Sequence, residues 1–163
     1  MEKDFIALVN QNRGLLYKVC HVYEREREYQ QDLFQEIVLQ LWRAYPTFRG
    51  EARVTTWMYR IALNTAISYV RQILRRPALQ ALTSDEALVP AWESLEDESD
   101  SVAMLKEAIQ RLTNIEKALM MLYLEEKSYR EIADILGITT SNVGVKLNRI
   151  KSKLEQIIKT LPS

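Results

Sequence analysis

The sequence from residue 128 reads SYREIADILGITTSNVGVKLNRIKSKL, and it carries the signals of two helices joined by a tight turn. Ser128 followed by Glu131 has the form of a capping box, which starts the first helix. Gly137 can supply the positive φ with which a chain leaves a helix within one residue. Small Ala133 allows two helices to cross closely. This order of signals predicts a helix-turn-helix.

The second helix of this motif has two chemically different sides. Its apolar stripe consists of Val143, Leu147, Ile150, Leu154, Ile157 and Ile158. The opposite side carries hydroxyls, amides and cations without a carboxylate, and such groups contact phosphates and base edges in duplex DNA. The predicted DNA-binding residues are Thr140, Ser141, Asn142, Val145, Lys146, Arg149 and Lys153. The free N–H groups of the first turn, at residues 140–142, would add an anion site.

Two features of this motif have alternative interpretations. Crossed helix pairs with a Gly turn also occur in structural bundles, so the turn alone does not establish DNA binding. Gly144 within the second helix costs about 1 kcal/mol relative to Ala. Either its backbone approaches a partner closely, or the weakness is tolerated.

Helical periodicity also dominates the first half of the chain. Apolar residues recur at helical spacing from Phe5 to Tyr23 with an interruption at Gly14, which predicts one or two opening helices. A further pattern from Leu33 ends before Pro46, whose ring cannot continue the hydrogen bonds of a helix.

A long helix is expected after a loop at residues 47–54. Thr55 or Thr56 can cap it, and its pattern holds until Pro77. Its apolar stripe consists of Trp57, Met58, Ile61, Ala62, Thr65, Ala66, Tyr69, Val70 and Ile73. With only four Gly and four Pro in 163 residues, the chain is predicted to be all-α.

Charge divides the chain into three parts, although the formal net charge is zero. Lys and Arg outnumber Asp and Glu in residues 1–79 and 111–163, and acidic residues dominate between them. The acidic stretch has no sustained period. We predict two small helical domains, residues 1–77 and 102–163, joined by an acidic linker at residues 78–101. Basic ends favour a nucleic-acid partner, which responds to the local field.

The second domain is expected to begin with a further helix pair. Apolar residues at Val102, Leu105 and Ile109 restart a helical stripe, and Thr113 with Glu116 forms another capping box. The helix-turn-helix follows this pair.

The first domain combines cations with aromatic side chains. Its candidate residues for single-stranded or melting DNA are Phe48, Arg49, Arg53, Arg60, Asn64, Arg71 and Arg75, because cations contact phosphates while aromatic and amide groups hold unstacked bases. Trp57 and Tyr69 lie on the apolar stripe and are expected in the core. The positions of Phe48 and Tyr59 stay open.

The sequence offers little for catalysis, metal binding or membrane insertion. Cys20 and His21 are the single cysteine and the single histidine, and they are adjacent on a helix, so they point apart. A Gly-rich phosphate loop is absent from the sequence. We therefore expect a protein that is not an enzyme and has no cofactor or metal. No apolar run is long enough for a membrane span, which favours the cytoplasm.

Several motifs of the first domain occur in the order of a known family. They are Asp32-Leu33-Phe34-Gln35-Glu36, Leu41-Trp42-Arg43, Phe48-Arg49-Gly50-Glu51-Ala52 and Thr56-Trp57-Met58-Tyr59-Arg60-Ile61-Ala62-Leu63-Asn64. They resemble region 2 of the extracytoplasmic-function (ECF) sigma factors of RNA polymerase, and residues 111–154 resemble region 4. The two regions cover nearly everything except the extreme N-terminus and the linker.

The resemblance implies a factor that carries core RNA polymerase to promoter DNA. Region 2 would bind the polymerase clamp and open the -10 element, and region 4 would read the -35 element as duplex. The clamp-binding residues would be Asp32, Gln35, Glu36 and Gln40. The loop from Phe48 to Val54 would help form a pocket for a flipped -10 base, with Arg60 and Asn64 nearby.

The resemblance implies further partners. Leu119 and Leu122 would help support a contact with the polymerase flap, and many members have an inhibitory anti-sigma factor. The acidic linker resembles the family's connector, which threads toward channels that otherwise hold nucleic acid. A merely soluble tether would have the same composition.

Two other functions fit part of the sequence. A conventional helix-turn-helix repressor or activator explains residues 111–163 equally well, but it leaves the basic, aromatic first domain unexplained. A polymerase-binding adaptor that does not contact DNA would make the cationic face around Lys146 and Arg149 a coincidence.

Overall fold

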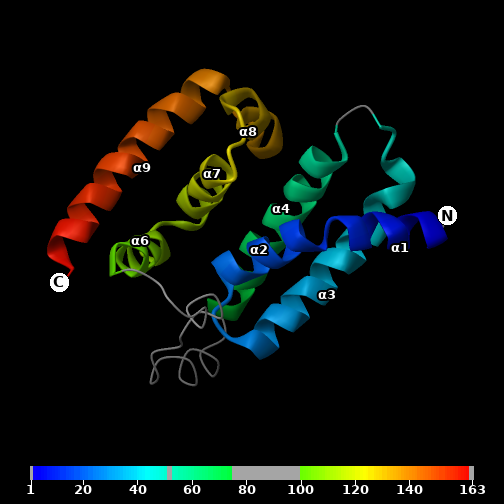
Figure 1. Ribbon diagram of the computed structural model, residues 1–163. Helices are drawn as coiled ribbons and strands as arrows, with labels where there is room; N and C mark the ends of the chain where they lie inside the picture. The colour runs from blue at the N-terminus through cyan, green and yellow to red at the C-terminus, as the bar shows by residue number, and fades with distance from the viewer. Residues whose placement is uncertain (1, 51–52, 75–99, 162–163) are drawn as a thin grey trace. The chain divides into compact units, whose positions relative to one another are not determined.

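The computed structural model describes residues 2–50, 53–74 and 100–161. These residues form eight α-helices and one short 3-10 helix, with no strand among them (Figure 1). The chain divides into two compact units, residues 1–94 and 95–163, and each has its own buried apolar residues. The predicted all-α class is confirmed.

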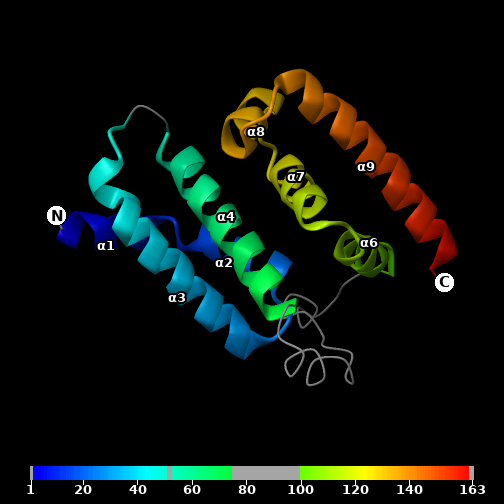
Figure 2. The same cartoon turned by 180° about the vertical axis from the view of Figure 1, so that it is seen from behind.

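The first unit contains α1 (Glu2–Gln11), α2 (Arg13–Tyr23), α3 (Arg27–Ala44), the 3-10 helix η1 (Tyr45–Thr47) and α4 (Val54–Leu74). α2, α3 and α4 pack against one another, as Figures 1 and 2 both show. Their core consists of Leu16, Val19, Cys20, Leu33, Ile37, Leu41, Met58, Ala62, Leu63 and Ala66. Pro46 lies in η1 directly after α3 ends, as its ring predicts.

The opening segment forms two helices, and the break lies at Asn12 rather than at Gly14. The Asn12 side-chain amide donates a hydrogen bond to the Leu8 carbonyl oxygen at 2.9 Å, near the end of α1. Gly14 lies in the first turn of α2. A Gly interrupts an apolar pattern because it has no side chain, even where the backbone stays helical.

The sequence-based start and stripe of α4 need correction. The Trp57 N–H donates to the Arg53 carbonyl oxygen at 3.1 Å, so the helix begins before Thr55 and Thr56, which therefore do not cap it. Because α4 packs on both α2 and α3, its buried side is broader than one stripe and is rotated from the predicted one. The buried residues are Thr56, Met58, Tyr59, Ala62, Leu63, Ala66 and Ile67, whereas Trp57, Ile61, Thr65, Tyr69 and Val70 are half-buried.

The second unit contains α6 (Asp100–Gln110), α7 (Asn114–Leu124), α8 (Tyr129–Leu136) and α9 (Thr140–Thr160). α9 packs against the other three helices. Its buried stripe is Val143, Leu147, Ile150 and Leu154, and the predicted Ile157 and Ile158 are half-buried. Both predicted capping boxes are present, at Thr113 with Glu116 and at Ser128 with Glu131.

The start of the second unit differs in detail from the prediction. Asp100 and Ser101, assigned to the linker, already belong to α6. Val102, assigned to the apolar stripe, is 42% exposed. The rest of the predicted linker, residues 78–99, lies outside the described residues.

Candidate nucleic-acid and polymerase interfaces

The helix-turn-helix is formed by α8, a short turn and α9. Gly137 adopts a left-handed conformation with φ 71°, as predicted, and the N–H groups of Gly137 and Ile138 both donate to the Ala133 carbonyl oxygen, at 2.8 and 3.2 Å. The Thr139 hydroxyl then caps α9 by accepting from the Asn142 N–H at 3.1 Å. The expectation that the Asn142 N–H is free for an anion is therefore wrong, because Thr139 already occupies it.

Gly144 lies where α9 crosses the start of α8. A Cβ atom at position 144 would lie 3.5 Å from Cε2 of Tyr129, which is an ordinary van der Waals distance. The close approach therefore occurs within the unit, between the α9 backbone and an aromatic ring. The contact helps set how α9 lies on α8 without requiring Gly at this position.

The side of α9 opposite its buried stripe is exposed. Of the predicted DNA-binding residues, Thr140, Ser141, Asn142, Val145, Lys146 and Arg149 are exposed, as are the neighbouring Asn148 and Ser152. One side of a single helix thus presents hydroxyls, amides and two cations to the surroundings, an arrangement suited to a groove of duplex DNA.

Lys153 differs from the other predicted DNA-binding residues because it has a partner within the unit. Its Nζ lies 2.7 Å from Oε1 of Glu116, the same carboxylate oxygen that closes the capping box of α7. Partial burial opposes ionisation of Glu116, but hydrogen bonds from Lys153 and Thr113 outweigh it and lower the pKa of this carboxyl below its usual value. The pair connects α9 to the start of α7.

One further cation of α9, beside its buried stripe, has no sequence signal. Lys151 is exposed, and its Nζ lies 4.4 Å from the centre of the Tyr123 ring. A hydrogen bond with Tyr123 raises the pKa of Lys151 above its usual value. Only the packing of α9 on α7 brings these two residues together, and no sequence signal identifies the pair.

In the first unit, the predicted -10 residues lie before and along α4. Arg49 and Arg53 are exposed in the segment before the helix, and Arg60, Asn64 and Arg71 are exposed at helical spacing on one side of it. Arg75 lies outside the described residues. The described cations therefore lie in the segment just before α4 and along one face of that helix.

Some aromatic residues near these cations stay partly exposed, and one is fully in the core. The Phe48 ring lies 4.7 Å from the Trp57 ring, and the Trp57 ring lies 6.4 Å from that of Tyr45. Tyr59 is only 2% exposed and belongs to the core. Trp57 and Tyr69, both expected in the core, are half-buried. Phe48 thus keeps part of its ring exposed while it rests on Trp57.

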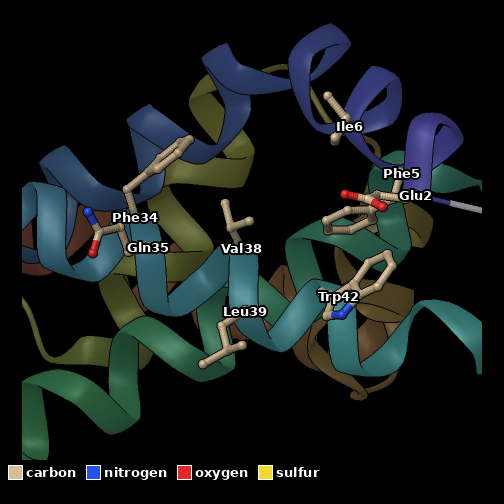
Figure 3. A pocket seen from close by; sticks show the side chains of 8 residues that line it. All are labelled: Glu2, Phe5, Ile6, Phe34, Gln35, Val38, Leu39 and Trp42. Atoms are coloured by element: carbon tan, nitrogen blue, oxygen red, sulfur yellow. The ribbon is translucent and has the colours of Figure 1, made fainter.

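Three of the four predicted polymerase residues of α3 border two different grooves. Gln35 lines an apolar groove of about 610 Å³ between α1 and α3, together with Glu2, Phe5, Ile6, Phe34, Val38, Leu39 and Trp42 (Figure 3). Phe5 supports this groove from beneath, because its ring packs on the rings of Trp42 and Tyr45 at 5.0 and 5.3 Å. Ile6, Leu39 and Trp42 remain 40 to 51% exposed. The apolar part of this surface was not predicted, since its residues come from two helices.

The second groove is polar and lies between α3 and α4. It has a volume of about 520 Å³ and is lined by Glu36, Gln40, Asn64, Thr65, Ser68, Tyr69 and Gln72. The Gln40 amide donates to the Glu36 carboxylate at 2.9 Å, which orients both side chains. The groove brings two predicted polymerase residues, Glu36 and Gln40, beside a predicted DNA residue, Asn64. Asp32 is exposed on α3 and lines neither groove.

Several remaining residues are engaged in packing. Leu119 and Leu122 are at most 1% exposed, so any role at the polymerase flap would be indirect, through the core of the unit. Cys20 is buried, and burial raises its thiol pKa to about 12. The described residues contain no group of three or more ligating side chains placed to hold a metal. None of the described helices is both long and apolar enough for a membrane span.

Comparisons with known proteins agree with this geometry. Residues 8–76 match the family Sigma-70 region 2, and residues 103–154 match Sigma-70, region 4. The chain is 28% identical to RNA polymerase sigma-H factor of Pseudomonas aeruginosa over 97% of its own length and 86% of that protein. It is 29% identical to ECF RNA polymerase sigma-E factor of Haemophilus influenzae, over 80% of this chain and 75% of the relative.

A solved structure has the same fold. It is the sigma factor RpoE in complex with the anti-sigma factor NepR from Bartonella quintana, with a TM-score of 0.71 and 18% identity, covering 98% of this chain and 99% of that one. Both conserved regions of the sigma-70 class are thus present in one chain and in the expected order. The chain belongs to the ECF sigma factors, which direct RNA polymerase to specific promoters.

Proposed function

We propose that the first unit binds core RNA polymerase and opens the -10 element, while α9 reads the -35 element as duplex. The factor acts by binding, without chemistry of its own, in the cytoplasm where polymerase works. The exposed outer side of α9 carries this proposal, because it presents hydroxyls, amides and cations opposite the buried stripe of a helix-turn-helix.

The proposed -35 contacts are Thr140, Ser141, Asn142, Val145, Lys146, Arg149 and Lys153. The side chains of the first two turns suit base edges, and the cations suit phosphates or guanine. Lys153 already contacts Glu116. Since an ammonium has three donors, Lys153 can keep that partner and still offer a hydrogen to a phosphate.

The proposed polymerase surface combines the polar residues of α3 with the apolar groove beside them. Asp32, Gln35, Glu36 and Gln40 would provide directional contacts. The exposed parts of Ile6, Leu39 and Trp42 would provide apolar area at the α1–α3 groove. An amphipathic clamp helix fits this combination, because it can place an apolar stripe in the groove and polar side chains along its edge.

The proposed -10 contacts are Phe48, Arg49, Arg53, Arg60, Asn64, Arg71 and, outside the described residues, Arg75. Their cations would follow the phosphates of a separated strand, and the exposed part of Phe48 on Trp57 offers a ring for an unstacked base. The polar groove beside Asn64 offers amide and hydroxyl groups to a base edge.

We further propose two functional domains joined by an acidic linker, the first at residues 1–77 and the second beginning with α6 at Asp100. An anti-sigma factor is also proposed as a partner. RpoE, which has a similar fold, was solved in complex with an anti-sigma factor. The exposed apolar groove is a surface that an inhibitor could share with polymerase.

Run-off transcription tests this proposal directly. Purified core polymerase, alone or with the full chain, is given a genomic fragment library, and RNA start sites are mapped. We expect new start sites only with the chain. The double variant Lys146→Glu/Arg149→Glu should lose these start sites and still bind core polymerase.

The matched control is Lys159→Glu, which reverses an exposed cation in the last turn of the same helix. It should initiate normally. Unchanged promoter binding by the double variant would favour an adaptor that does not contact DNA. A chain that neither binds core polymerase nor changes start sites would refute the proposal.

A further inference from the structure

Val145 is an apolar side chain in the middle of a polar surface. It is 49% exposed, and it is the only large apolar residue with such exposure among the described residues of α9. The buried stripe lies on the opposite side of the helix, with Val143 and Leu147 two residues before and after it. Val145 therefore points outward at the centre of the candidate DNA face.

Polar side chains surround Val145 on this face. Ser141 and Asn142 lie about one helical turn before it, and Asn148 and Arg149 lie about one turn after it, all of them exposed. Any molecule that accepts these four polar groups must therefore also accept an apolar branched side chain between them.

Folding does not account for a Val at this position. Its exposed side chain contributes little to the core, and a β-branched residue is slightly unfavourable in a helix. A substitution here should therefore change recognition without disturbing the unit.

The major groove of duplex DNA contains one apolar group, the C5-methyl of thymine. The second helix of a helix-turn-helix places its N-terminal residues against base edges, and Val145 lies in the second turn of α9. We propose that Val145 contacts the methyl group of a thymine in the -35 element and so helps determine promoter sequence. This inference rests on the proposed function of α9.

Replacing thymine by uracil removes only that methyl group, which makes a direct test possible. Duplexes are first selected from a pool with a randomised -35 region and a constant remainder, using core polymerase with the full chain. Each thymine of the selected -35 element is then replaced singly by uracil. Binding is measured for the wild type, for Val145→Ala and for the matched control Val102→Ala, an exposed Val on α6.

At one thymine, the effect of uracil replacement on binding should depend on Val145. Removing the methyl of that thymine should weaken wild-type binding about fourfold, the value for one buried methyl-sized group. Val145→Ala should bind the thymine duplex several-fold more weakly and lose its sensitivity to uracil at that position alone. Val102→Ala should behave like the wild type.

Two outcomes would overturn the inference. One is a selected element in which no uracil replacement weakens binding. The other is an equal uracil effect in the wild type and in Val145→Ala at every position. Both are distinct from failure of the proposed function, in which the wild type with core polymerase selects no duplex at all.

Discussion

The two units carry their candidate surfaces in different ways. In the second unit, the candidate DNA face is one side of one helix, α9, opposite its buried stripe. In the first unit, the candidate polymerase residues Gln35, Glu36 and Gln40 border grooves between two helices, α1 with α3 and α3 with α4. Periodicity within one segment predicts the first kind of surface. The second kind depends on which helices become neighbours.

The substitution with the largest expected effect on stability tests whether the two units unfold independently. Leu147→Ala removes a fully buried side chain from the α9 stripe and should destabilise the second unit by about 2 to 5 kcal/mol. Trp42 and Trp57 belong to the first unit, and the third tryptophan, Trp92, lies in the predicted linker. In a Trp92→Phe background, tryptophan fluorescence therefore reports the first unit. In denaturant titrations the circular dichroism should therefore acquire an earlier transition while the fluorescence midpoint stays.

Val145→Ala serves as the control, since it truncates an exposed residue of the same helix and should change stability by less than about 0.5 kcal/mol. A shift of both signals together in Leu147→Ala would mean that the units unfold as one.

The next effect concerns the groove between α1 and α3. Leu39→Lys places a charge on its apolar lining and should weaken association with core polymerase about tenfold or more, because burying a Leu contributes about 1.5 to 3 kcal/mol. A fluorescence titration of labelled chain with core polymerase measures this. Gln31→Lys is the control, an exposed position on the same helix that lines neither groove. If both variants lost the same affinity for core polymerase, the groove would not be part of the polymerase-binding surface.

Replacing each of two glycines of the helix-turn-helix by Ala should change the stability of the second unit in opposite directions. Gly137 has φ 71°, so Gly137→Ala should destabilise the second unit by about 1 to 2 kcal/mol. Gly144 is helical, and an added Cβ would meet Tyr129 at an ordinary distance, so Gly144→Ala should stabilise by up to about 1 kcal/mol. Thermal unfolding followed by circular dichroism compares them. A loss of stability in both would show that the α8–α9 crossing needs Gly at position 144.

The smallest effect concerns the ion pair between Glu116 and Lys153. The pKa of Glu116 is lowered in the folded state, so its stabilising contribution is present above its usual value of 4.5 and is lost as the pH falls through the folded-state pKa. The side chains are 24% and 41% exposed, which limits the contribution to about 1 kcal/mol or less.

Glu116→Gln isolates this charge because Gln can still close the capping box. The stability difference between wild type and variant should be present near neutral pH and should disappear as the pH falls below the lowered folded-state pKa of Glu116. The control is the same comparison in a Lys153→Met background, where the difference should be smaller. A pH-independent difference would assign the effect to the capping box instead of the ion pair.

Much of the second unit could be predicted from the sequence because its signals are local. Each capping box uses residues three positions apart, and Gly137 ends α8 by its own backbone conformation. The exposed side of α9 follows from its stripe. The Lys153–Glu116 pair could not be predicted, since its members are 37 positions apart and meet only when α9 packs on α7.

In the first unit the sequence correctly predicted helices but misplaced the buried side of α4. Because α4 packs on two neighbours, Tyr59 and Leu63 enter the core and Trp57 moves partly to the surface. The sequence by itself determined the helices, the capping boxes of α7 and α8, the turn at Gly137 and the side of α9 that faces outward, because these depend on neighbouring residues in the chain. Only the tertiary structure decided the two grooves and the distant ion pair, because they depend on which helices lie side by side.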